Sequence, residues 1–427
     1  MRVDIKHFEV SKGTNSPPLI HLQNISLQQG NIIGIKSDDF LKAKLFFYGL
    51  LGYRSLFPDL KFKIQVSPPI EKFRTQLFLE SPQTQLSGLR VTVATEVALP
   101  AENRCSKDIK DKTLSTLNIF RIQNLSQRSP FSLSTGELQK SILASQLITD
   151  PEIWALIYPA SGLDFESQNT LLQILNERKE GKIILIYDLP YIVNNFSDFI
   201  LDINNGELSR NYNKNAQSPK LATHNSRSFK VYKLTQKEDT KDLKPVLQIE
   251  DLCFSYSSSK KLIEDFSLTI KKGEKVAVVG PNGSGKTTLA KLICGIIKPQ
   301  KGKVRLYTSP FFVPSNPTNF FTFPTIEEEL LAVNNSLQES DIDELLEKIS
   351  LNHKRKEDPN SLTIEEKKLL SIALASASNS QLIILDEPTA FSSSRCQGLT
   401  LKFLQEDFKN RSVILITHDT ELLQKLS

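Results

Sequence analysis

The sequence is poor in cysteine and contains no long apolar run. Its four cysteines among 427 residues lie far apart, form no CxxC pair and have no histidine at the spacing of metal ligands. This pattern argues against a disulfide framework and a zinc site, and we expect reduced thiols in the core. No apolar stretch approaches the roughly 18 residues of a membrane-spanning helix, and the first ten residues mix charges where a signal peptide is apolar. We therefore expect a protein that neither crosses a membrane nor carries a cleavable signal.

Excess charge of one sign is scarce outside a single segment. The formal net charge is +5, but residues 210–245 alone hold nine Lys and Arg against three acidic residues. The rest of the chain is close to neutral, so composition does not predict a face for nucleic acid. The hydrophobic content of 39% and charged content of 24% are typical of a folded globular protein and exclude collagen-like, coiled-coil and wholly disordered chains.

The basic segment divides the chain into two similar halves. It is rich in Asn, Ser and Lys and follows neither a helical nor a strand period, which is typical of a linker. Residues 22–37 (LQNISLQQGNIIGIKS) resemble residues 263–280 at an offset of 243, and residues 132–164 resemble residues 361–393 at an offset of 229. Such internal repetition indicates homologous modules. We predict two domains and a linker, over residues 1–212, 246–427 and 213–245 respectively.

Short runs of Val, Ile and Leu alternate with longer helical stretches in both halves. Examples are IIGI, WALIY and KIILIY in the first half, and KVAVV, LIILD and SVILIT in the second. The alternation predicts an α/β fold in which helices cover a mostly parallel sheet. In the first half, DFILDINNGELSR predicts a further hairpin-like pair of strands. The second half stops soon after the matching ILITHD, so we expect it to be shorter at its C-terminal end.

The strongest chemical signal is GPNGSGKTT at residues 280–288, between the strand KVAVV and the helical stretch LAKLICGI. In this GxxxxGK[ST] pattern, glycines let backbone N–H groups converge on phosphate oxygens, and the helix N-terminus adds a positive dipole end. Lys286 is expected to hold the β- and γ-phosphates, and Thr287 to bind Mg²⁺. A glycine-rich turn that binds nothing is the alternative, and the strand–loop–helix context disfavours it. The predicted nucleotide-binding residues are Gly280, Pro281, Asn282, Gly283, Ser284, Gly285, Lys286, Thr287 and Thr288.

Two acids follow the apolar strand LIILD. Asp386 suits a Mg²⁺ ligand acting through water, and Glu387 suits a base that orients or deprotonates the attacking water. After the next strand, ILITHD places His418 at a strand's carboxyl end, where ligands of parallel sheets gather. Helix capping by the acids and a structural role for the histidine are the alternatives, both less favoured beside a phosphate loop. The predicted catalytic residues are Glu387 and His418, and the predicted metal ligands are Thr287 and Asp386.

The order and spacing of these motifs resemble those of the ABC ATPase superfamily, over both halves but not the linker. The resemblance implies two nucleotide-binding domains, each with a mostly parallel sheet, an antiparallel β edge and a helical subdomain, paired head to tail within one chain. It also implies that ATP and Mg²⁺ bind between the phosphate loop of one domain and the LSGGQ signature helix of the other. Tyr256 matches the family's adenine-stacking aromatic residue, although an edge-strand tyrosine fits the sequence nearly as well.

Compared with this family pattern, the first half has lost its own phosphate chemistry. SDDFLKAKL (residues 37–45) replaces the loop, Ile157 and Tyr158 replace the acids, and Tyr187 is matched to the histidine. The first half nevertheless keeps a signature, LSTGE, and an SGLD loop. For these the resemblance implies nucleotide contacts by Ser134, Gly136, Glu137 and Asp164.

The second half shows the opposite loss. Its signature position reads LTIEE (residues 362–366), and AFSS replaces SGLD. Both signature positions also fit S/T-x-x-E capping boxes, which let a helix begin without nucleotide. That explanation suffices for LTIEE, whereas the retained glycine of LSTGE favours a nucleotide role. We expect one hydrolysing site, built from the second-half loop and the first-half signature, and one dead site.

A narrower resemblance concerns residues 81–103 (SPQTQLSGLRVTVATEVALPAEN). This segment is similar to the one after the Q-loop in ATPases of energy-coupling factor (ECF) importers for vitamins and transition metals, where a short helix contacts the transmembrane coupling subunit. Residues 316–330 match more loosely, and Glu80 and Ser315 stand at the Q-loop glutamine positions.

The ECF resemblance implies a peripheral ATPase at the cytoplasmic face of the cell membrane. It would be bound there through transmembrane coupling and substrate-binding subunits, with no direct contact to nucleic acid. The alternative is a soluble ABC ATPase that acts mechanically on a ribosome, on nucleic acid or in cofactor assembly. Translation-factor members carry a long charged helical linker and keep both sites, which this sequence does not, and this difference favours the importer.

Overall fold

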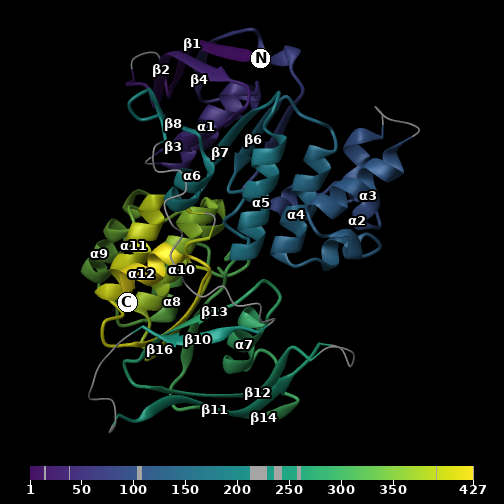
Figure 1. Ribbon diagram of the computed structural model, residues 1–427. Coiled ribbons are helices and arrows are strands. Elements are labelled where there is room, and N and C mark those ends of the chain that lie inside the picture. The colour runs from purple at the N-terminus through teal and green to yellow at the C-terminus, as the bar shows by residue number, and fades with distance from the viewer. Residues whose placement is uncertain are drawn as a thin grey trace. The chain divides into compact units, whose positions relative to one another are not determined.

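The computed structural model of the chain describes residues 1–13, 16–37, 39–102, 108–211, 228–234, 243–256, 261–390 and 392–426. The chain divides into two compact units, Met1–Ser218 and Pro219–Ser427, which Figure 1 colours from purple to teal and from teal to yellow. Within the described residues, no helix combines the length and apolar character needed to span a membrane.

The first unit combines a mostly parallel sheet with a smaller antiparallel one. Its strands are β1 (Arg2–Ser11), β2 (Ile20–Gln28), β3 (Asn31–Lys36), β4 (Lys61–Ser67), β5 (Thr75–Phe78), β6 (Ile153–Ile157), β7 (Ile183–Tyr187), β8 (Phe199–Asp202) and β9 (Glu207–Arg210). Its helices are α1 (Phe40–Leu50), α2 (Val93–Ala98), α3 (Ile109–Ile119), α4 (Thr135–Leu147), α5 (Phe165–Arg178) and α6 (Pro190–Phe196). The larger sheet has the order β5-β6-β7-β3-β8-β9, and the smaller one β2-β1-β4.

The second unit repeats this plan. Its strands are β10 (Lys230–Lys233), β11 (Pro245–Phe254), β12 (Ile263–Lys271), β13 (Lys275–Val279), β14 (Lys301–Leu306), β15 (Pro310–Val313), β16 (Leu382–Asp386) and β17 (Ser412–Ile416). Its helices are α7 (Lys286–Ile293), α8 (Ile326–Val333), α9 (Glu339–Lys348), α10 (Ile364–Ala377), α11 (Ser394–Gln405) and α12 (Thr420–Leu426). The larger sheet has the order β10-β13-β17-β16-β15, and the antiparallel one β12-β11-β14.

The central strands are buried on both faces, as the continuous apolar runs predict. Every residue of β6, β7, β16 and β17 is buried, and neighbouring strands in this group run parallel. Two hydrophobic cores of the second unit lie on opposite faces of its sheet, since Val276 and Val278 belong to one and Ala277 to the other. The predicted α/β fold is confirmed, and DFILD and ELSR form the expected antiparallel pair β8–β9.

One segment of the predicted linker is part of the second sheet. Lys230–Lys233 form β10, which pairs antiparallel with β13. Val231 packs against one hydrophobic core and Tyr232 against the other, because successive strand residues face opposite sides of a sheet. Residues 230–233 therefore belong to the second unit, although their basic composition had placed them in the linker.

Candidate nucleotide site

The predicted chemical groups of the second half meet at one edge of its larger sheet. β13, β17 and β16 are adjacent parallel strands, so their carboxyl ends lie side by side. The glycine-rich loop follows β13, Asp386 ends β16, and His418 lies just beyond β17. The strand register places Asp386 opposite Ile416, which brings the acids and the histidine together.

The shape of the loop requires its glycines. Gly283 and Gly285 have φ angles of +75° and +98°, in the left-handed region that side chains disfavour. A β-carbon at Gly280 would lie 2.6 Å from the Cα of Phe229. Substitution at any of these positions would therefore distort the turn that leads into α7.

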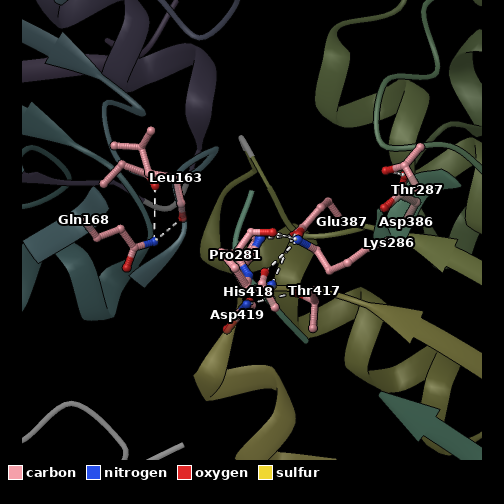
Figure 2. Close-up of polar contacts among 12 residues, drawn as sticks. Leu163, Gln168, Pro281, Lys286, Thr287, Asp386, Glu387, Thr417, His418 and Asp419 are labelled. Atoms are coloured by element: carbon pink, nitrogen blue, oxygen red, sulfur yellow. Dashed lines mark hydrogen bonds and ion pairs between the residues drawn. The ribbon is translucent and has the colours of Figure 1, made fainter. Parts of the chain in front are cut away.

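Lys286 and Thr287, at the start of α7, connect the loop to the sheet. The Nζ atom of Lys286 donates to the carbonyls of Gly280 at 2.7 Å and Pro281 at 3.1 Å. The hydroxyl of Thr287 donates to Oδ2 of Asp386 at 2.8 Å (Figure 2). The two predicted metal ligands are therefore in direct contact. Burial raises the pKa of Asp386.

Glu387 and His418 form a second contact at the same edge. The backbone N–H of His418 donates to Oε2 of Glu387 at 3.3 Å, and His418 Nε2 lies 3.5 Å from Oε1 (Figure 2). Burial raises the pKa of Glu387 to about 7. A general base is most effective when its pKa lies close to the working pH, so this environment suits the predicted role of Glu387.

Two buried polar atoms at this edge fit a phosphate and a metal ion. Ser284 Oγ and Asp386 Oδ1 are buried and have no hydrogen-bond partner within the described part of the chain. Buried polar groups are normally satisfied. A hydroxyl beside the loop can donate to a phosphate oxygen, and a carboxylate oxygen beside Thr287 is a typical Mg²⁺ ligand. The residues present thus fit both ATP and Mg²⁺.

Tyr256 lies beside the start of α7. Its hydroxyl is 3.3 Å from that of Thr288, and its ring packs edge-on against Phe254 with centroids 5.0 Å apart. The side chain is nevertheless 65% exposed. An exposed aromatic ring next to the loop is compatible with the predicted contact to adenine, which stays a prediction.

In the first unit, aromatic rings replace these polar groups. Tyr158 directly follows β6, as Glu387 follows β16, and both residues have positive φ angles, +54° and +47°. The ring of Phe40, from the segment that replaces the loop, lies 5.5 Å from that of Tyr158 and 6.1 Å from that of Tyr187. All three residues are buried. This edge of the first sheet is therefore packed with apolar surface instead of phosphate-binding groups.

An ion pair occupies the two first-unit positions that correspond to metal-site positions in the family pattern. At the offset of 243, Lys44 matches Thr287, and Glu80 stands at the Q-loop position. The Nζ atom of Lys44 lies 2.6 Å from Oε1 of Glu80, and both side chains are partly buried. A lysine ammonium here opposes a second cation, so Mg²⁺ is not expected in this unit.

Strand register corrects the match between Tyr187 and His418. Tyr187 pairs with Ile157, and Ile416 pairs with Asp386, so Tyr187 corresponds to Ile416. Both segments, KIILIYD and ILITHD, end in an aspartate. Aligning the two aspartates matches Tyr187 to His418, which the strand register does not support.

The loops beyond these strands differ in length. In the first unit Asp188 directly follows β7 and accepts from the backbone N–H of Ala160 at 2.8 Å. In the second unit Asp419 accepts from the hydroxyl of Thr389 at 2.8 Å, but it follows β17 only after Thr417 and His418. Each aspartate holds the segment after the strand-end position, and the first unit has no equivalent of the histidine.

The predicted signature residues form helix caps in the first unit. Ser134 caps α4 in a capping box with Glu137, whose Oε2 lies 2.9 Å from the Ser134 nitrogen. Gly136 is buried in the first turn of α4, and Asp164 caps α5 by accepting from the Ser167 N–H at 2.9 Å. Thr363 and Glu366 form the same box at α10. Both helices thus begin with the capping box that was the alternative explanation. Nucleotide contacts by the first unit stay a prediction.

Sequence reasoning missed two cations, Lys44 and Lys368. Lys368 is buried in α10 and contacts the segment that carries Glu387. The sequence does contain a sign of this residue: Lys368 directly precedes the apolar run LLSIALA, and it aligns with Gln139 at the offset of 229.

Comparison with known proteins identifies an ABC-type domain in the second half. Residues 263–390 match the family model described as ABC transporter. A protein of Methanosarcina mazei described as an ABC transporter ATP-binding protein is 26% identical, over 99% of this chain and 91% of its own length. A Bacillus subtilis protein described as an HMP/thiamine import ATP-binding protein is 25% identical, over 81% of this chain and 71% of its own.

A solved assembly shares the fold. The structure described as ribosome-bound archaeal Pelota and ABCE1 matches with a TM-score of 0.73 and 18% identity, over 98% of this chain and 74% of that one. The likeness confirms the predicted tandem ABC-type fold, and the family model over residues 263–390 implies ATP binding by the second half.

We expect the chain to bind close to one Mg-ATP. The first unit lacks the loop glycines and carries Lys44 and three buried aromatic rings where a second nucleotide would need phosphate and metal ligands. Isothermal titration calorimetry with a non-hydrolysable ATP analogue measures the stoichiometry directly. Two tight sites per chain would show this interpretation of the first unit to be wrong.

We expect Glu387→Gln to bind ATP but to lower its turnover by roughly two to four orders of magnitude, as for loss of a general base. Tyr158→Phe is the matched control, because it changes the corresponding residue of the first unit. Its turnover should stay within a small factor of wild type. Steady-state ATPase assays check both, with circular dichroism to verify folding; equal losses in the two variants would contradict the assignment.

Proposed function

We propose that this chain, an ABC-type ATPase with two tandem domains, energises a membrane transporter through one competent ATP site. The observation that carries the proposal is the convergence of Lys286, Thr287, Asp386, Glu387 and His418 at one sheet edge of the second unit. The corresponding edge of the first unit holds Phe40, Tyr158 and Tyr187 instead.

In the proposed mechanism, the residues of the second unit divide the work of hydrolysis. The loop N–H groups and Lys286 bind the β- and γ-phosphates, while Tyr256 stacks on adenine. Thr287 and Asp386 would hold Mg²⁺, which would neutralise charge at the phosphates when bound. Glu387 orients the attacking water and accepts its proton, and His418 holds the γ-phosphate end of the site.

We further propose that the first unit completes this site through its signature. Ser134, Gly136, Glu137 and Asp164 are the nucleotide-contacting candidates there. The support is complementary loss: the second unit keeps the loop but has acidic Glu365 in its own signature position, while the first unit keeps LSTGE but lacks the loop. A carboxylate at that position disfavours a phosphate, so the surviving combination joins the two halves.

Exposed apolar side chains support a partner at residues 81–103. Leu89 is 79% exposed and Val91 82% exposed. Their segment is held by the buried carboxylate of Glu96, which accepts from the N–H of Ser87 at 2.6 Å and from its hydroxyl at 2.7 Å. Exposed apolar side chains that lie close together on one segment can mark a docking site for a partner.

The second unit presents a similar arrangement. Buried Glu329 accepts from the N–H groups of Thr322 and Phe323, and the Phe323 side chain is 44% exposed. We propose that these segments bind the transmembrane coupling subunit of an ECF-type importer of a vitamin or metal ion, with a separate substrate-binding subunit. The chain would then lie at the cytoplasmic membrane face through its partners alone. The importer description of the Bacillus subtilis relative favours this assignment over a soluble ATPase acting on a ribosome, on nucleic acid or in cofactor assembly.

We expect Ser134→Arg to abolish ATP hydrolysis, because it places a bulky side chain in the proposed phosphate site from the first-unit signature. Thr363→Arg, at the equivalent helix cap of the second unit, should leave turnover nearly unchanged. ATPase assays on the same purified complex test the pair. Wild-type turnover in Ser134→Arg, or lost turnover in a folded Thr363→Arg, would contradict a site completed by the first unit.

We expect the double substitution Leu89→Ser and Val91→Ser to release membrane subunits. Affinity purification from solubilised membranes should recover hydrophobic subunits with the wild-type chain and much less with the variant. Leu56→Ser, at another exposed leucine of the same unit, is the control and should retain them. Ribosomal or nucleic-acid components in place of membrane subunits would favour the soluble alternative.

A further inference from the structure

Lys368 is a buried cation on the helix beside the catalytic edge of the second unit. It lies in the second turn of α10, and only 2% of its surface is exposed. Burying an ammonium group is strongly unfavourable unless hydrogen bonds and opposite charges compensate it. The buried charge of Lys368 therefore needs compensating contacts from outside the apolar part of α10.

The hydrogen bonds of Lys368 reach the backbone that carries Glu387. Its Nζ atom donates to the carbonyl of Glu387 at 3.1 Å and to the carbonyl of Ala390. These two residues close a turn, since the Ala390 N–H donates to the Glu387 carbonyl at 3.2 Å. Lys368 thus holds both ends of the turn in which Glu387 adopts its positive φ angle.

The first unit shows that this anchoring is a property of the position. Gln139 is the fifth residue of α4, as Lys368 is of α10. Its Nε2 atom donates to the carbonyls of Tyr158 at 3.0 Å and Pro159 at 2.6 Å. An uncharged amide is therefore sufficient to anchor the turn where the strand-end residue is a tyrosine.

The second unit differs by placing a positive charge at this anchor. The carboxylates of Glu387, Asp386 and Glu365 act on the Lys368 ammonium and favour its charged form. Burial lowers the pKa of Lys368 to about 8, which leaves the group mostly protonated at neutral pH. The cation thus coincides with the unit in which the strand end carries two acids.

We propose that Lys368 is a positioning residue for ATP hydrolysis: it fixes the turn that presents Glu387 to the attacking water and offsets the negative charge of the adjacent acids. This inference rests on the proposed role of Glu387 as the base. Removal of a residue that orients a functional group typically lowers activity by 10- to 100-fold. Small displacements of a reacting group have effects of similar size.

The test compares Lys368→Met, which removes the donor and the charge, with Lys368→Gln, which copies the first unit. In the full-length chain we expect Lys368→Met to lower kcat by about 10- to 100-fold while KM and the Kd for ATP change by less than about threefold. Lys368→Gln should recover a substantial part of the lost kcat, because the amide of Gln139 reaches the carbonyl of Tyr158, which corresponds to that of Glu387. Wild-type kcat in Lys368→Met would overturn the proposal.

A matched control separates positioning from a general loss of stability. Gln139→Met removes the same anchor in the first unit, where no base depends on it, and should leave kcat within about threefold of wild type. If Gln139→Met lowers kcat as much as Lys368→Met at an equal loss of thermal stability, Lys368 is merely structural and the proposal fails. If Lys368→Met does not fold, Lys368→Gln provides the test instead. If the kcat of folded Lys368→Gln is as low as that of Glu387→Gln, an amide does not anchor the turn and the proposal fails.

The same assays distinguish failure of the inference from failure of the proposed function. A wild-type chain that binds ATP without hydrolysing it, even with its membrane partners, would refute the role of Glu387. A wild-type chain that hydrolyses ATP and is insensitive to Lys368→Met would refute only the role of Lys368.

Discussion

Both units depend on one backbone turn at the carboxyl edge of the sheet. Glu387 donates its N–H to Ile416 on the adjacent strand at 2.8 Å, and Tyr158 donates to Tyr187 at 2.6 Å. Each has a positive φ angle, which costs a non-glycine residue about 1–3 kcal/mol and persists only where neighbouring contacts impose it. The anchors Gln139 and Lys368 supply such contacts. The turn thus fixes the strand-end residue beside the neighbouring strand, whatever that residue is.

Because the turn is kept in both units, the chemistry can be lost in one without loss of the fold. Phe40, Tyr158 and Tyr187 pack together in the first unit, where Ile157 and Tyr158 stand at the positions of Asp386 and Glu387. A buried carboxylate without a metal or cation would cost more than the aromatic packing that replaces it. The ion pair between Lys44 and Glu80 likewise keeps two charged groups compensated without nucleotide. The first unit can therefore keep its fold without a nucleotide at this edge of its sheet.

The sequence predicted the parts of this arrangement that are local. The glycine pattern of residues 280–288, the apolar strands and the strand-end acids each depend on neighbours in sequence, and the structure brings Thr287, Asp386, Glu387 and His418 together as expected. Contacts between distant segments could not be predicted in this way. Lys44 meets Glu80, and Lys368 meets the Glu387 carbonyl, only because the fold brings those segments together. The strand β10 was not predicted, because its basic composition resembles that of the linker around it. The match of Tyr187 to His418 was wrong, because register is set by pairing with a neighbouring strand.

We propose that nucleotide is bound at the phosphate loop of the second unit and not at residues 37–45, which replace that loop in the first unit. Photolabelling with an azido-ATP analogue, followed by mass spectrometry of the peptides, tests it most directly. We predict label on peptides around Tyr256, none on peptides around residues 37–45, and loss of all label in Lys286→Ala. Label on the first-unit segment that survives Lys286→Ala would contradict the claim.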